Sequence, residues 1–120
     1  MSIKKINMEI PKMDYQIIEI SVTENGIETK LSENDNIYFT VKKCAYDSEP
    51  TLQKSLNNGI NYNEETKKYE IEIKSEDTEN MEIDEVYGYD ITVYYEGNRP
   101  KQKVVGNLKI GIKYTLNEVV

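Results

Sequence analysis

The chain has 120 residues and a formal net charge of −7, so its length suits one domain and its charge disfavours binding to nucleic acid or to an anionic membrane. It contains no histidine, the commonest general base, and its single cysteine, Cys44, cannot form an internal disulfide. Residues 1–10 hold no long apolar stretch, so we expect no secretion signal, no membrane span and synthesis in the cytoplasm.

Apolar and polar side chains alternate along the first half of the chain, a pattern typical of half-buried strands. Strands are predicted at residues 5–9, 16–22, 35–43 and 51–56. The dipeptides Asn25-Gly26 and Asn58-Gly59 adopt positive φ easily and favour tight turns. No window shows a sustained helical period, so this half is predicted to be a series of short strands joined by turns.

The second half continues the same pattern, with strands predicted at residues 68–74, 86–94 and 107–115 and a turn at Gly97-Asn98. Residues 75–81 favour one helical turn with Ser75 as its N-cap. About seven short strands separated by turns predict an all-β fold, an immunoglobulin-like sandwich of antiparallel strands. We expect it to form a single domain over residues 1–120.

Side chains on one face of these strands should form a single core. That set is predicted to include Phe39, Val41, Ile71, Ile73, Ile91 and Ile110. Tyr87 and Tyr89 fall in the same phase, so we expect them in the core as well. One of the two is expected to form a tyrosine corner, in which the hydroxyl bonds back to the preceding loop.

Tyrosine is abundant, with ten copies against one phenylalanine, and it suits interfaces as well as half-buried strands. The neighbours Tyr94 and Tyr95 should point to opposite sides of their strand, so at least one should be exposed. These tyrosines are a candidate interface or ligand platform. The candidate interface residues, taken with the basic positions that follow, are Tyr94, Tyr95, Arg99, Lys101 and Lys103.

Charge is distributed unevenly along the chain. Residues 64–85 hold ten acidic residues and three lysines, whereas residues 99–113 hold five basic residues and no acid. The simpler interpretation is that both segments are solvated strand faces. The alternative is a dipolar surface that docks neighbouring copies head to tail.

No group of residues has the spacing of a catalytic or metal site. The acids Asp77, Asp84 and Glu85, and the pair Glu33 and Asp35, do not match a calcium loop, and turns and caps explain them more simply. Cys44 has no histidine base, so we expect a half-buried small apolar residue. The glycines are scattered and form no phosphate loop. We therefore predict no catalytic residue, no cofactor and no bound metal.

Several stretches suggest a family. They are residues 35–43, Glu49-Pro50, Gln53-Lys54, residues 69–73, Glu76-Asp77-Thr78 and residues 87–91. Together they resemble small proteins encoded in virion gene clusters of prophages from Gram-positive bacteria, and the resemblance covers residues 14–112. Proteins of this kind look like immunoglobulin-like sandwiches that serve as head fibres or decoration proteins, or as the N-terminal module of upper baseplate proteins.

The resemblance implies a non-enzymatic virion structural protein that acts by packing against other virion proteins. It also implies a multi-copy or homo-oligomeric assembly, made in the cytoplasm of the bacterial host and located in the virion. The alternative is a cell-surface adhesin domain or another ligand-binding β-sandwich module.

Overall fold

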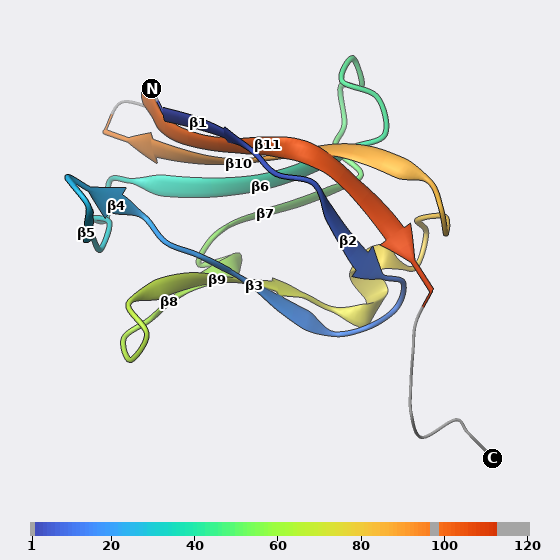
Figure 1. Cartoon of the computed structure of the whole chain (residues 1–120), viewed down its shortest axis with the longest axis horizontal. Helices are drawn as coiled ribbons and strands as arrows, with labels where there is room; N and C mark the ends of the chain where they lie inside the picture. Colours follow the sequence, from blue (N-terminus) through green and yellow to red (C-terminus); the bar gives the residue numbers. More distant parts are fainter. Residues whose placement is uncertain (1, 97–98, 113–120) are drawn as a thin grey trace.

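The computed structural model describes residues 2–96 and 99–112, and strands are its main regular structure (Figure 1). The elements are β1 (Ser2–Lys5), β2 (Met8–Pro11), β3 (Gln16–Ile20), β4 (Thr23–Glu24), β5 (Ile27–Glu28), β6 (Asn36–Lys42), β7 (Leu52–Leu56), β8 (Gly59–Asn63), β9 (Lys68–Ile73), the 3₁₀ helix η1 (Ser75–Thr78), β10 (Val86–Tyr95) and β11 (Arg99–Gly111). The prediction of an all-β fold is confirmed.

Nine strands form one mixed sheet. Eight of them follow the order β1-β11-β10-β6-β7-β8-β9-β3, and the ninth, β2, pairs with β11 further along that strand than β1 does. The strands β1 and β2 run parallel to β11, and β7 runs parallel to β8, while the other pairs are antiparallel. The strands β4 and β5 make a separate hairpin. The expectation of an entirely antiparallel set of about seven strands is therefore wrong.

The sheet curls back on itself. In Figure 1, an upper layer of β6, β10 and β11 lies across from a lower layer of β3, β8 and β9, and the chain passes between layers from β2 to β3. At this crossing Met13 has a positive φ of 57°, and its backbone N–H donates to the Thr78 hydroxyl over 2.7 Å. This hydrogen bond therefore joins η1 to the connection between β2 and β3, where the chain passes from one layer to the other.

The core lies between the two layers. Ile37, Phe39 and Val41 of β6 have no exposed surface, because every second side chain of that strand points inward. All six residues predicted for the core are buried there, with exposures from 0 to 3%: Phe39, Val41, Ile71, Ile73, Ile91 and Ile110. The strand phases read from the sequence are confirmed for β6, β9 and β10 and for the second half of β11.

Tyr87 and Tyr89 are in the same core, exposed by 4% and 5%. The Tyr87 hydroxyl accepts a hydrogen bond of 3.1 Å from the backbone N–H of Glu82, in the loop that precedes β10. The predicted tyrosine corner is confirmed at Tyr87. Tyr89 instead donates to the carbonyl oxygen of Ile6, over 2.6 Å.

The strand predicted at residues 5–9 is interrupted in the structure. The chain pairs with β11 as β1 and again as β2, and the break falls at Ile6 and Asn7. There the Asn7 side chain accepts from the backbone N–H of Asn107 over 3.0 Å, in place of a ladder bond. Gly106 permits this approach, since a Cβ on it would overlap the Ile6 carbonyl. The alternation of apolar and polar residues in the sequence does not predict this break.

Three other boundaries differ from expectation. The strand β11 begins at Arg99 because β10 and β11 pair along their whole length, whereas the sequence predicted residues 107–115. The strand β8 was not predicted, because its sequence GINYN is largely polar. The cap of η1 is Lys74 and not Ser75, since the Asp77 carboxylate accepts from the Lys74 backbone N–H. The Gly97-Asn98 turn and residues 113–115 lie outside the described residues.

Candidate functional site

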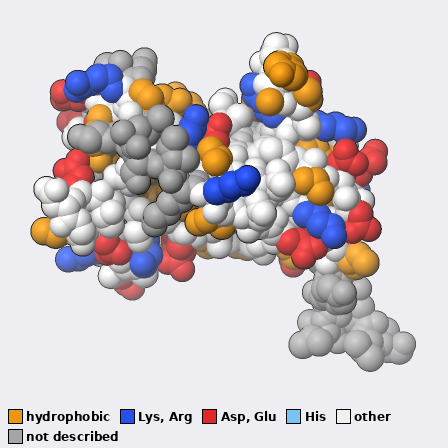
Figure 2. All heavy atoms as spheres, turned by 45° about the horizontal axis from the view of Figure 1, so that its top comes forward, with side chains coloured by type: hydrophobic (Ala, Val, Ile, Leu, Met, Phe, Trp, Pro, Cys, Tyr) orange, Lys and Arg blue, Asp and Glu red, His pale blue; other side chains and the backbone are white. Residues whose placement is uncertain are grey.

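A hollow of about 720 Å³ lies on the outer face of the upper layer, on the side away from the core. Its floor comes from β6, β10 and β11, and one wall is the loop of residues 43–51, which contributes Ala45, Ser48 and Pro50. We call this surface the outer hollow. In Figure 2 the loop stands above the neighbouring surface and carries apolar side chains at its end.

The floor follows from the strand register. Because β6 and β10 turn their apolar residues inward, the alternate residues point outward. Asp90 lies opposite Thr40 on one side and Val105 on the other, and Thr40 lies opposite Gln53 of β7. The next row holds Gly88, opposite Lys42. The floor of the outer hollow therefore presents the polar side chains of Thr40, Lys42 and Asp90 beside the apolar Val105.

Two of these polar groups are held in place by hydrogen bonds. The Thr92 hydroxyl donates to the Asp90 carboxylate over 3.1 Å, and the Gln53 amide nitrogen donates to the Thr40 hydroxyl over 3.0 Å. Thr92 is 1% exposed, so the hydroxyl that bonds Asp90 is shielded from water. At one end the rings of Tyr38 and Tyr94 meet edge to face, with centroids 5.6 Å apart and planes at 81°.

The predicted interface residues do not form one patch. Tyr94 lines the outer hollow, and Lys103 lies opposite Thr92 on the same outer face. Tyr95 and Arg99 instead line a second hollow of about 350 Å³, with Glu24, Asp35 and Glu96 among its other residues. Lys101 belongs to β11. The prediction that Tyr94 and Tyr95 point apart is confirmed, but both are half-buried, so the expectation that one is exposed is wrong.

The environment of Tyr95 suppresses ionisation of its phenol. Burial, assisted by the nearby Glu24 carboxylate, raises the pKa of Tyr95 to about 12. A strand irregularity between Val93 and Tyr94 brings this end of β10 against Arg99. Tyr95 is therefore a neutral group between the β4–β5 hairpin and the sheet at any physiological pH.

The acidic and basic segments lie mostly in different layers. Glu70 and Glu72 of β9 point outward from the lower layer, and Glu19 of β3 lies directly opposite Glu70. Lys103 lies on the upper layer, and four strands separate β11 from β9. Among the described residues, one ion pair joins the two segments, with Lys109 3.6 Å from Asp84.

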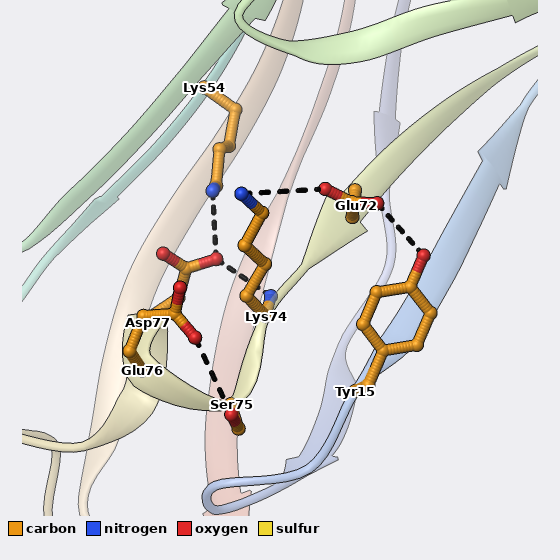
Figure 3. Close-up of polar contacts among 7 residues, drawn as sticks. All are labelled: Tyr15, Lys54, Glu72, Lys74, Ser75, Glu76 and Asp77. Carbon is orange, nitrogen blue, oxygen red and sulfur yellow. Dashed lines mark hydrogen bonds and ion pairs between the residues drawn. The ribbon is translucent and has the colours of Figure 1, made fainter.

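Asp77, a candidate calcium ligand in the sequence, forms a structural contact. Its carboxylate accepts from Lys54 over 2.7 Å and from the Lys74 backbone N–H over 2.7 Å (Figure 3). Lys54 reaches it by passing over Gly59, where a Cβ would collide with the lysine stem. Within residues 2–96 and 99–112, no three His, Cys, Asp or Glu side chains are grouped so that they could hold a metal ion.

Two side chains of the loop of residues 43–51, Cys44 and Tyr46, are exposed to solvent. Tyr46 is 95% exposed, and Cys44 is exposed, so the expectation of a half-buried cysteine is wrong. Cys44 lies beyond the end of β6, and its backbone N–H donates to Asp47 within a tight turn. Tyr46 therefore lies almost fully in solvent, on the loop that forms one wall of the outer hollow.

Sequence reasoning missed most of the outer hollow. The usable pattern was the set of polar residues in the outward phase of two predicted strands, which includes Thr40, Lys42 and Asp90. That pattern did not show which strands lie side by side.

No protein-family model matches the chain, and no curated protein matches it either. The described part contains no helix with the length and hydrophobicity required to span a membrane.

Proposed function

We propose that this chain is a non-enzymatic structural component of a tailed phage or prophage virion, and that it acts by packing against other virion proteins and copies of itself. We also infer that its fold is an immunoglobulin-like sandwich. Support for the fold comes from the two layers, from the N-terminal segment that pairs first with β11 and then, as β3, with β9, and from the tyrosine corner at Tyr87. The sequence resemblance supports the virion role.

The observation that carries the packing role is the pair of facing glutamates on the lower layer. Like charges directly opposite each other on neighbouring strands destabilise a sheet. Glu19 and Glu70 are such a pair, whereas Glu72 on the same outer face already contacts Lys74 and Tyr15. On the upper layer, Lys103 forms no salt bridge with any residue that the structure describes. A cation from a neighbouring copy would relieve the repulsion on the lower layer.

Open strand edges offer a second means of contact. The strand β3 pairs only with β9, so one side of its backbone is free within the described sheet. Its outward residue Ile17 is 44% exposed, and Tyr15 just before it is 55% exposed. Unpaired edges with exposed apolar residues are surfaces on which another chain can dock. In an assembly of many copies such edges would be covered.

The charge contact is tested by sedimentation velocity of the purified protein at ionic strengths of about 0.1 M and about 1 M. Self-association is expected at the lower value and should weaken at the higher one, because salt screens exposed charges. Lys103→Glu should weaken association, and Glu19→Lys combined with Lys103→Glu should restore it. Glu33→Lys, an exposed change of equal charge elsewhere, is the control. A monomer at both ionic strengths would remove self-assembly from the proposal.

The virion role is tested separately by quantitative mass spectrometry of particles purified after induction of a lysogen that carries the gene. We expect the protein at a fixed ratio to the major capsid or tail protein. A deletion mutant should yield particles that lack it and are altered in stability or assembly. Absence of the protein from purified particles would overturn the virion assignment.

A further inference from the structure

Among the glycines of the strands, Gly88 has the most room for a side chain. A Cβ on Gly106 would overlap the Ile6 carbonyl, and one on Gly59 would collide with Lys54. A Cβ on Gly88 would meet only the Lys42 carbonyl oxygen, at 3.9 Å, an ordinary contact. Glycine inside a strand lowers stability, and it often marks a place where a ligand approaches closely. Gly88 lies on the floor of the outer hollow.

The charges of the outer hollow balance. Lys42 and Asp90 line it together, and neither forms a salt bridge with a residue in the described part of the chain. A site with one cationic and one anionic group has little net attraction for a phosphate or for a metal ion. It offers instead a donor and an acceptor at two separate points, which suits an uncharged ligand with several hydroxyl groups.

The remaining lining matches that chemistry. The Gln53 amide and the Thr40 hydroxyl are already joined to each other, and Asp90 is fixed by Thr92, so these groups are oriented before a ligand arrives. At one end Tyr38 and Tyr94 offer phenol rings that combine an apolar face with a hydroxyl. The volume of about 720 Å³ lies within the range of small-molecule sites.

The floor excludes a peptide strand bound by sheet extension. The strands β6, β10 and β11 each have hydrogen-bonded neighbours on both sides, so their backbone groups are used in the ladder. Recognition on this face must come from side chains. We propose that the outer hollow binds a neutral saccharide, held by Asp90, Gln53 and Lys42 through its hydroxyls and seated above Gly88 against the tyrosine rings. This site is independent of the proposed virion role.

The test is a titration of the ¹⁵N-labelled full chain, followed by amide chemical shifts, with four neutral saccharides: maltose, lactose, N,N′-diacetylchitobiose and rhamnose. At least one should shift the amides of Gly88, Asp90 and Thr40 in a saturable way. Gly88→Leu fills the hollow from its floor and should abolish binding without lowering the melting temperature. Asp90→Asn should weaken binding about tenfold, through loss of a charged hydrogen-bond acceptor.

The matched control is Glu33→Gln, which also removes one carboxylate charge but at an exposed position that does not line the outer hollow, and it should leave saccharide binding unchanged. Triglycine, which carries both charges and no hydroxyl groups, is titrated in parallel. The proposal is overturned if none of the four saccharides gives saturable shifts on this face. It is also overturned if Gly88→Leu binds as well as the original chain, or if triglycine binds there in preference to all four sugars.

Discussion

Three core tyrosines bury their rings and use their hydroxyls to hold backbone groups, two of them far away along the chain. Tyr69 accepts from the Leu31 backbone N–H over 2.7 Å, Tyr87 accepts from Glu82, and Tyr89 donates to Ile6. Phenylalanine could fill the same volume but could not satisfy these backbone groups. This accounts for part of the excess of tyrosine over phenylalanine, which composition alone associates equally well with interfaces.

At the same scale, Ile91→Ala removes a side chain that is 3% exposed in the middle of β10. We expect it to lower the free energy of unfolding by about 2–5 kcal/mol, because the packed core cannot close over the lost volume. Urea denaturation followed by circular dichroism measures this change. The control Ile27→Ala, at a position that is 70% exposed, should change stability little. Equal effects of the two substitutions would contradict the assigned core.

The raised pKa of Tyr95 predicts a loss of stability at alkaline pH. The unfolded chain releases this proton near pH 10.0, whereas the folded chain holds it until about pH 12. The contribution of Tyr95 is therefore complete below pH 10 and is lost as the pH rises toward 12. Unfolding free energies measured across this window should fall less steeply for Tyr95→Phe than for the original chain. Tyr46→Phe, at a position that is 95% exposed, should fall like the original chain.

At the scale of elements, the contact between Lys54 and Asp77 fixes η1 against β7. Both side chains are largely buried, with 12% and 15% exposed. Asp77→Asn should lower stability by about 1–3 kcal/mol, since it leaves the lysine charge without its partner and weakens the cap on Lys74. Amide exchange in residues 75–78 should accelerate. The neighbouring change Glu76→Gln is the control. An equal loss of stability from Glu76→Gln would show that the effect comes from removing any acidic charge here and not from this ion pair.

Elements with strong apolar alternation were predictable, and elements defined by their neighbours were not. In β6 and β9 the alternating pattern gave the buried phase and nearly the right ends. The strand β8 has only Ile60 as a buried apolar residue and exists because β9 lies beside it. The outward residues of β6 and β10 were identified as polar, but the outer hollow that they form also requires the loop of residues 43–51.

At the scale of the whole molecule, stability rests on one continuous core and on no cross-link. Cys44 is free and exposed. We expect thermal melting curves to coincide with and without reductant, with and without a chelator of divalent ions, and for Cys44→Ser. A chelator that lowered the melting temperature by many degrees would restore calcium as a structural ion. A reductant that did so would indicate that the folded form contains a disulfide between chains.

The pairing of β1 and β2 with β11 joins residues one hundred positions apart, since Ser2 lies opposite Gln102 and Met8 opposite Leu108. Such a contact has high sequence separation, so we expect it to form late in folding. During translation residues 2–11 must wait, without their partner, until β11 has left the ribosome. Where many copies are made close together, that segment can meet the β11 of another copy first, so we expect strand exchange between chains to be the characteristic misfolding route of this protein.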